Sequence, residues 1–441
     1  MLHPNRAMTA LSVALAASLY GAPARAESDP LRELKAQVDD LLRKVADIER
    51  NQRAVDGSPA VSTPGNVVTG GATKGSFKLP GSNTSVTLGG YVKLDAIFSN
   101  PSAGVASTGD QELEASSIPV GPNAKTGERN QVKFHARQSR IFGSTSTPTP
   151  WGDLTTYVEG DFFGAPGNES VSNSNGLRMR HAFGTLGGLL AGQTWTTFSD
   201  VATYPETVDF GGPVGIIFAR QAQVRWTQLF TGGQWSVALE NPETVAALPS
   251  GASFRADDDR LPDFAGNVHF NTAWGKYSIV GMARQLRVDS ASAPASRAQK
   301  LGAALGVNGI VPTFGKDDVR FSAYAGNGIG RYAGLGFFPD ALLDAGGHLI
   351  LPTQWLAMVA YRHVWTTSLR STVALSGLAS SNPAGTGASV NKRSDSAHLN
   401  VIWSPVPQTN LGLEYIHARR EVQDGSAGSL NRLQASAQYF F

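Results

Sequence analysis

Basic side chains recur at alternate positions in several segments of the sequence that have the composition of strands. These residues are Lys133, His135 and Arg137, then Arg178 and Arg180, and on a later segment Arg225. Alternate side chains of a strand project from the same face, so each group would point to one side. Arginine stays protonated and can hold a carboxylate through two parallel hydrogen bonds. The pattern therefore predicts a wall that attracts anions.

A long connection at 196–219 could stand opposite this wall. Its acidic and aromatic residues include Glu206, Asp209, Phe198, Tyr204, Phe210 and Phe218. Large aromatic side chains gain stability when they are buried, so a loop surrounded by water has little reason to carry four of them. We therefore expect this connection to fold inward against the wall of a channel. A loop that caps the channel from outside is the alternative.

Together these residues predict a constriction that binds passing solutes. Its members are Lys133, Arg137, Arg178, Arg180, Arg225, Glu206 and Asp209. Glu159 and Asp161 would face or flank the basic groups. Arg140 and Arg220 are harder to assign, because each falls out of phase or at the end of a strand. The alternative is that these charges only solvate a wet lumen and pair with one another.

Motifs for catalysis are absent or incomplete. The sequence contains no H-E-x-x-H, no G-x-S-x-G and no cysteine. Gly328-x-Gly330-x-x-Ala333 fits a loosened dinucleotide fingerprint, but the glycines and the proline that follow argue against the helix that this motif requires. We expect no enzymatic activity, no cofactor and no metal site.

The elements that must position the basic residues are strands. Alternating segments run from Thr84 to Phe441, divided by seven short and eight long connections, which predicts sixteen strands. The last ten residues alternate almost without a break, and a C-terminal Phe resembles the assembly signal of bacterial outer-membrane barrels. We expect an all-β fold, a 16-stranded antiparallel transmembrane β-barrel at 84–441, although 14 or 18 strands would also fit the pattern.

The N-terminal part predicts export. A basic residue, an apolar stretch and the Ala24-Arg25-Ala26 site indicate a signal peptide at 1–26. Heptads at 27–55 predict a short N-terminal coiled-coil helix, with an amphipathic helix packed on its own barrel as the alternative. A flexible linker is expected at 56–83. An even strand number places both barrel ends, and so the coiled coil, in the periplasm.

The charge balance excludes one class of partner. Removing Arg6 and Arg25 with the signal peptide leaves 35 of the 37 basic residues to match 35 acidic ones. A neutral chain does not attract nucleic acid through bulk charge. The partners we expect are outer-membrane lipid, small anionic solutes and further copies of the chain.

Four stretches resemble the DcaP-like trimeric porin family of Gram-negative outer membranes. They are Gly89 to Asp95, Ala136 to Arg140 followed by Glu159 to Phe162, Arg178 to Thr197 continuing to Pro205 to Pro213, and Gly328 to Tyr332. The resemblance implies a homotrimer of sixteen-stranded barrels with an inward third loop, and passive uptake of small acidic solutes such as dicarboxylates. It also implies a basic wall of Arg137, Arg178 and Arg180 facing Glu206 and Asp209.

These observations predict an outer-membrane porin for passive diffusion of small, preferentially anionic solutes. A general non-selective porin and a non-conducting structural or adhesive barrel are the alternatives.

Overall fold

The computed structural model of this chain describes residues 68–100, 111–126, 129–165, 167, 170–290 and 296–441, and three helical positions, Asp40, Arg43 and Lys44. Apart from those three positions, the predicted signal peptide, coiled coil and first part of the linker lie outside the described residues. The chain divides into units at 1–67 and 68–441. The second unit holds the fold described below.

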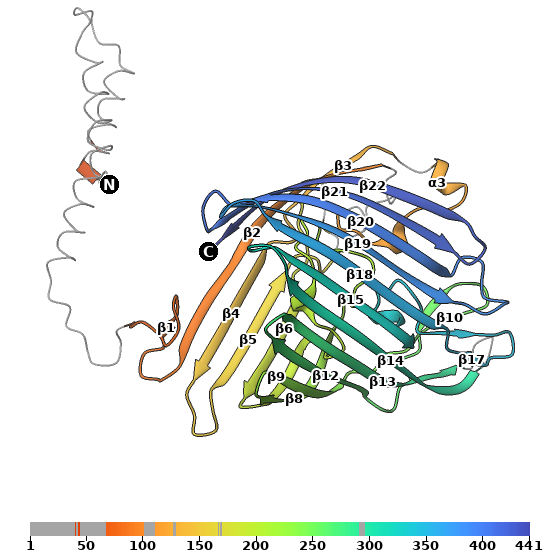
Figure 1. The fold of residues 1–441 in the computed structure, drawn as a ribbon, viewed down its shortest axis with the longest axis horizontal. Helices are drawn as coiled ribbons and strands as arrows, with labels where there is room; N and C mark the ends of the chain where they lie inside the picture. The colour runs from red at the N-terminus through yellow and green to blue at the C-terminus, as the bar shows by residue number, and fades with distance from the viewer. Residues whose placement is uncertain are drawn as a thin grey trace, which may run out of the picture. The chain divides into compact units, whose positions relative to one another are not determined.

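In the described part of the chain, sixteen antiparallel strands close into one barrel (Figure 1), which confirms the predicted strand number. In barrel order they are β2 (Ser85–Asn100), β4 (Arg140–Thr147), β5 (Leu154–Asp161), β6 (Arg178–Leu186), β7 (Leu189–Trp195), β8 (Arg220–Phe230), β9 (Gly233–Glu240), β12 (Asp263–Thr272), β13 (Gly275–Ser290), β14 (Ser296–Pro312), β15 (Asp318–Asn327), β18 (Thr353–Val364), β19 (Leu369–Ser381), β20 (Asn391–Trp403), β21 (Thr409–Val422) and β22 (Ala427–Phe440).

The last strand closes the barrel against the first. β22 pairs with β2 from Tyr91↔Phe440 to Asn100↔Asn431, so the alternating C-terminal segment is the closing strand. Closure leaves no unpaired edge, which a sheet in lipid must avoid. Side chains alternate as predicted: Val92 and Leu94 are 54% and 49% exposed on the outside, whereas Lys93 and Asp95 are 3% and 0% exposed on the inside.

One barrel strand is broken in the middle. β3 (Gln131–His135) and β4 both pair with β2, and Ala136 to Ser139 interrupt them. The Ser139 hydroxyl accepts a hydrogen bond from the Lys93 N–H at 3.0 Å and donates one to the Lys93 carbonyl at 3.3 Å. A side chain thus replaces the missing ladder bonds at the break.

The end of the segment predicted as a linker is partly ordered. It contains β1 (Phe77–Lys78), which pairs with the start of β2 through Phe77↔Val86.

The long connections carry further short elements. η2 (Ala115–Ser117) and α3 (Asn123–Thr126) lie in the first connection, η3 (Val201–Thr203) in the third, and η4 (Gly330–Tyr332) after β15. β10 (Val245–Ala247), β11 (Ser253–Arg255), β16 (Ala341–Leu343) and β17 (Leu349–Ile350) form a separate four-stranded sheet. The glycine motif at 328–333 lies in a connection and contains the single 3-10 turn η4, without the longer helix that a dinucleotide-binding motif requires, as the sequence indicated.

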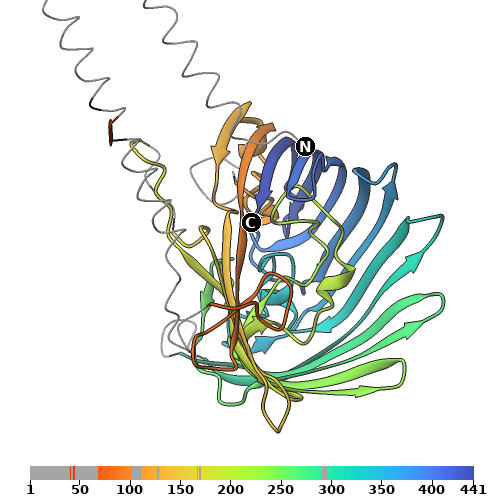
Figure 2. The same cartoon turned by 90° about the vertical axis from the view of Figure 1, so that its left-hand side faces the viewer.

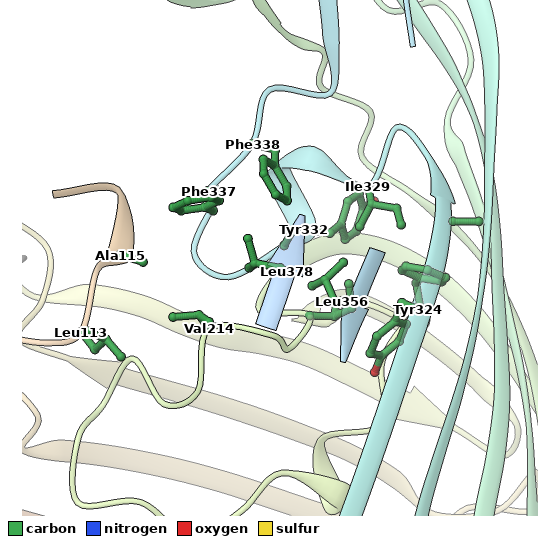
Figure 3. Packing of buried hydrophobic residues seen from close by; sticks show 14 of the residues in the cluster. Leu113, Ala115, Val214, Tyr324, Ile329, Tyr332, Phe337, Phe338, Leu356 and Leu378 are labelled. Carbon is green, nitrogen blue, oxygen red and sulfur yellow. The ribbon is translucent and has the colours of Figure 1, made fainter. Parts of the chain in front are cut away.

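An apolar core joins several of these connections to the barrel wall. Leu113, Val214 and Tyr332 come from connections, and they pack with inward residues such as Leu356 (Figure 3). Phe198 of the third connection belongs to the same core. Their contact buries apolar surface that would otherwise face a water-filled lumen. The core therefore fixes the third connection inside the barrel, as the view in Figure 2 also shows.

Candidate functional site

The connection between β7 and β8, called the third loop (196–219) below, folds into the barrel and lines its inner wall. At its start, Thr197 N–H donates to Glu240 of β9 at 2.6 Å. Farther along, Arg370 of β19 donates two hydrogen bonds to Glu206, at 2.7 and 2.5 Å. Glu240 belongs to the strand next to β8, whereas Arg370 belongs to β19, many strands farther around the barrel. The prediction of an inward third loop is confirmed.

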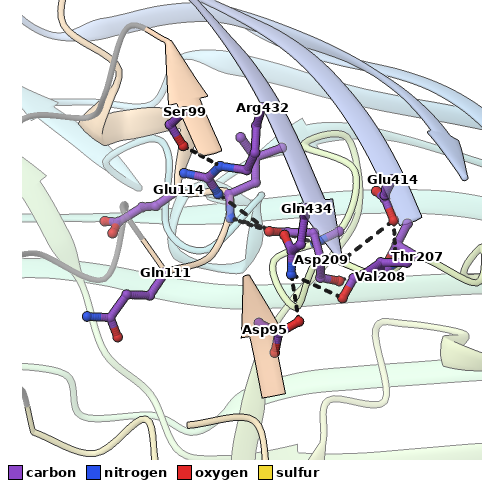
Figure 4. A network of polar contacts seen from close by, with 12 residues as sticks. Asp95, Ser99, Gln111, Glu114, Thr207, Val208, Asp209, Glu414, Arg432 and Gln434 are labelled. Atoms are coloured by element: carbon purple, nitrogen blue, oxygen red, sulfur yellow. Dashed lines mark hydrogen bonds and ion pairs between the residues drawn. The ribbon is translucent and has the colours of Figure 1, made fainter. Parts of the chain in front are cut away.

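The tip of the loop (207–212) is held by a buried polar network (Figure 4). The Glu414 carboxylate accepts hydrogen bonds from the backbone N–H groups of Val208 and Asp209. Lys93 donates to the Val208 carbonyl at 2.6 Å, and Arg432 pairs with Asp209 at 3.5 Å. Because these charges are shielded from water, each bond is stronger than its exposed counterpart.

The returning half of the loop lies directly on the backbone of the wall. An added Cβ at Gly215 would stand 2.2 Å from the Ala357 carbonyl oxygen and 2.7 Å from that of Gly377. Only glycine permits this approach. The Ile217↔Ala333 bridge then ties the loop to the segment after β15.

With the third loop on the wall from β9 to β22, the strands from β4 to β8 face the remaining lumen. Five arginines and two acids occur on these five strands. Arg178 donates to both carboxylate oxygens of Asp161, at 3.0 and 2.8 Å. Arg180 bridges Glu159 at 2.6 Å and Asp161 at 2.8 Å. The predicted pair Arg178 and Arg180 is therefore brought together with the two flanking acids.

A β-bulge adds one more group to this wall. The register between β5 and β6 shifts between Glu159↔His181 and Gly160↔Met179. The bulge lets two consecutive residues, Arg180 and His181, both face inward and become buried. Strict alternation along the sequence would have turned His181 outward.

Aromatic rings contact the arginines of this wall. Phe210 of the third loop stacks on Phe163 with centroids 4.6 Å apart, and the guanidinium carbons of Arg178 and Arg180 each lie 5.4 Å from the Phe210 ring centroid. Arg220 lies 4.1 Å from the ring centroid of Trp195. Rings hold guanidinium planes flat against them through cation–π attraction. The loop tip thus touches the basic wall at Phe210 and narrows the lumen there.

Other predicted site residues are held by contacts with the first and third connections or with the wall. Arg137 is 1% exposed and donates to the Phe162 carbonyl and to Gln111. Asp209 is 2% exposed and accepts hydrogen bonds from the Leu113 and Gly212 N–H groups. Glu206 is bound by Arg370. These contacts hold the first and third connections in place.

Lys133 and Arg225 keep the inward phase that was predicted for them. Lys133 is half-buried on β3 between Val132 and Phe134, which are 57% and 61% exposed on the outer face. Arg225 lines a polar cavity of about 220 Å³ together with Trp195 and Ser199 of the third-loop region. The predicted residues are therefore distributed over the length of the wall instead of one ring.

Two residues at the site had no clear sequence signal. Arg220 is the first residue of β8, where the loop ends, and its phase is ambiguous from the sequence. Glu112 belongs to the first connection and is 5% exposed. Burial and, next, the negative charge of Asp209 raise the pKa of Glu112 to about 8. Its location beside the constriction depends on how the first connection folds.

The pKa of Asp200 in the third loop is shifted in the opposite direction, downward. Burial alone would raise the pKa of this carboxyl, but hydrogen bonds from His269 and Ser278 hold it below its usual value. Asp200 therefore stays ionised and anchors the start of the loop.

Within the described residues, no group of three or more His, Cys, Asp or Glu side chains could hold a metal ion. No helix among them is long and apolar enough to cross a membrane.

A closed barrel of sixteen strands, with a loop folded into its lumen opposite a charged wall, defines the porin class of outer-membrane channels. The sequence model of the DcaP outer membrane protein family matches residues 34–441. The chain belongs to this family, which confirms the resemblance seen in the sequence.

Solved structures share the fold. The outer membrane channel DcaP of Acinetobacter baumannii is 22% identical, with a TM-score of 0.70 over 81% of this chain and 97% of that chain. An anion-selective porin from Comamonas acidovorans is 13% identical, with a TM-score of 0.53 over 81% of this chain and all 100% of that chain. OmpT of Vibrio cholerae is 11% identical, with a TM-score of 0.53 over 82% of this chain and 99% of that chain. The comparison with curated proteins finds no match.

Proposed function

We propose that this outer-membrane channel lets small solutes diffuse passively and prefers anions, with dicarboxylates as the favoured class. One observation carries the proposal. The strands that face the open lumen, β4 to β8, contain five arginines and two acids, an excess of three positive charges. A low-dielectric wall around a narrow lumen focuses the field of such an excess, although the whole chain is nearly neutral.

The proposed mechanism combines size exclusion with this field. The third loop narrows the lumen, and Phe210 brings its tip against Arg178 and Arg180. An anion entering the gap exchanges part of its hydration for guanidinium donors, and a concentration gradient drives it through. No bond is made or broken, so the protein has no catalytic role in this proposal.

A general porin without preference is favoured by a different observation. Arg178 and Arg180 are paired with Asp161 and Glu159, so part of their field is cancelled. Under this alternative, cations and anions would carry about equal shares of the current.

The distinguishing measurement is the reversal potential of the purified channel in a planar bilayer under a chloride salt gradient. We expect the wild-type reversal potential to have the sign that indicates anion preference, and the double variant Arg178→Ala/Arg180→Ala to give a smaller potential. Added succinate should block the chloride current. Arg297→Ala/Arg393→Ala is the matched control, because it removes the same charge from exposed sites, with side chains 91% and 55% exposed. A wild-type potential of zero or of cation sign would favour the general porin. Absence of any conductance would favour a structural or adhesive barrel.

We also propose that the channel is a homotrimer with residues 27–55 as a periplasmic coiled coil. One of the matched structures, of Vibrio cholerae OmpT, is described as a trimer form. The heptad pattern is too short to be stable alone and would gain from attachment to an oligomer. Light scattering of the full chain in detergent should give three times the mass of one chain, and a single-chain mass would refute the trimer.

A further inference from the structure

The arginines of the lumen wall differ in whether their donors are already used. In Arg178, the edge formed by Nε and Nη2 is filled by the two oxygens of Asp161. In Arg180, Nε and Nη1 are taken by Glu159 and Asp161. These two guanidiniums contribute charge to the lumen, but an anion would have to displace a protein carboxylate to reach the same edges.

Arg220 has no such partner. None of its side-chain nitrogens makes a hydrogen bond or ion pair within the described residues, and Nε and Nη2 are buried without an acceptor. The guanidinium is held only by rings, 4.1 Å from the Trp195 centroid and 5.4 Å from that of Phe218. Nε and Nη2 form the edge that binds a carboxylate through two parallel bonds.

A buried guanidinium edge without an acceptor destabilises the folded chain unless a ligand occupies it. Buried donors without acceptors destabilise a fold, and those found in native proteins call for a functional or structural explanation. Its charged neighbours do not supply one: Arg180 and Arg178 act on Arg220 most strongly and both are positive, and the weaker attraction of Asp161 comes without a hydrogen bond or ion pair among the described residues. A mobile anion would satisfy the free edge and reduce this repulsion.

The position of Arg220 suits a site on the path of solutes. It is the first residue of β8 and pairs with Trp195, the last residue of β7, where the third loop leaves and rejoins the wall. Nε and Nη2 are both buried, so an anion could reach this edge only if the side chain rotated toward the lumen.

A second unpaired arginine lies farther along the same strand. Arg225 makes no hydrogen bond or ion pair within the described residues, and its Nε is buried without an acceptor. It lines the cavity of about 220 Å³, which Trp195 also borders. Thr194, Ser199 and Thr227 line this cavity too, as do Asp200 and His269. Trp195 thus connects the two arginines.

We propose that Arg220 is the residue that docks the carboxylate of a transiting anion, that Arg225 receives it next, and that Arg178 and Arg180 act only through their field. The proposal rests on the anion preference proposed above and deepens it by assigning the binding residue.

Two charge-conserving variants test this assignment. Arg220→Lys keeps the charge but cannot form the two-bond edge, and Arg178→Lys makes the same exchange at a residue already paired with Asp161. The readout is the succinate concentration that halves the chloride current, together with the reversal potential. Losing one of two charge-assisted bonds should raise that concentration about tenfold in Arg220→Lys, with no change in reversal potential. Arg178→Lys should raise that concentration much less than Arg220→Lys does, because Asp161 already occupies the Nε and Nη2 edge of Arg178.

The outcomes separate this inference from the proposed function. A wild-type channel without anion preference refutes the proposed function itself. An anion-preferring wild type that succinate does not block, or an Arg178→Lys effect as large as that of Arg220→Lys, overturns the assignment of Arg220. Arg220→Gln provides a second test that does not depend on how a lysine packs on Trp195, and we expect it to weaken block at least as much as Arg220→Lys.

Discussion

Removing the Glu414 carboxylate should release the tip of the third loop while the barrel stays closed. Glu414 is fully buried and accepts hydrogen bonds from Val208 and Asp209, and His398 Nδ1 lies 2.6 Å from its other oxygen. Glu414→Ala leaves two loop N–H groups and an imidazole without their partner.

The size of the effect follows from these contacts. A hydrogen bond to a charged group contributes about 1.5–3 kcal/mol, and removing one member of a buried charged pair costs about 3–5 kcal/mol. We therefore expect the attachment of the tip to weaken by about 3–5 kcal/mol, which corresponds to a rise of roughly 10²- to 10⁴-fold in the detached population. Glu414→Gln should act less, by about tenfold or below, because its amide oxygen can accept from the loop and its NH₂ can donate to His398.

The native chain has no cysteine, so one introduced thiol reports on the tip alone. Val208→Cys places it at a side chain that is 3% exposed. We expect a water-soluble thiol reagent to modify it far faster in Glu414→Ala than in the parent. Glu421→Ala is the control, since Glu421 lies on the same strand and pairs with Lys392 and Arg419 instead of the loop. A rate in Glu414→Ala within about twofold of the Glu421→Ala rate would refute the reasoning, because that is the spread of ordinary surface substitutions.

Two other predictions concern the constriction. Burial raises the pKa of Glu112 to about 8, so this side chain should become a carboxylate near Arg178 as the pH rises from 7 to 9. The anion preference of the wild-type channel should therefore fall over this range. The reversal potential of Glu112→Gln should not change. Because the pKa of Glu112 is higher in the folded chain than in the unfolded chain, the folded state holds the extra proton, and the free energy of unfolding should also decrease as pH rises toward 8. If the reversal potential and stability of the wild type vary with pH in the same way as those of Glu112→Gln, both statements are contradicted. Gly215→Ala should lower the free energy of unfolding by about 1–3 kcal/mol, because the added methyl group overlaps the wall backbone. It should also lower the single-channel conductance, because the loop must move off the wall into the lumen. Gly143→Ala, where the nearest atom to an added Cβ is 3.5 Å away, should conduct normally, and equal conductance of the two variants would contradict the packing argument.

The sequence determined the barrel and the phase of its residues. Alternation is a local property of a strand, since each residue points opposite to its neighbour whatever the rest of the chain does. For that reason the strand number, the inward side of Lys133 and Arg225, and the alternating strand that closes the barrel could all be read from spacing. The aromatic content of 196–219 likewise indicated burial, which the inward third loop provides.

Tertiary structure decided which charges meet and which remain unpaired. Arg178 and Arg220 both lie at the start of a strand, yet Arg178 is bonded to Asp161 whereas Arg220 contacts aromatic rings. Strand register and the bulge at Arg180 set the distances from these side chains to the acids of β5. The sequence predicts that Arg137 and Asp209 line the lumen, but residues of the first connection, distant in sequence, contact and bury both. Pairing of this kind depends on separations of a few ångströms between remote segments, and Coulomb energy in a poorly screened interior changes steeply over that range. Local pattern therefore gives the direction in which a side chain points, and only the folded chain determines its partner.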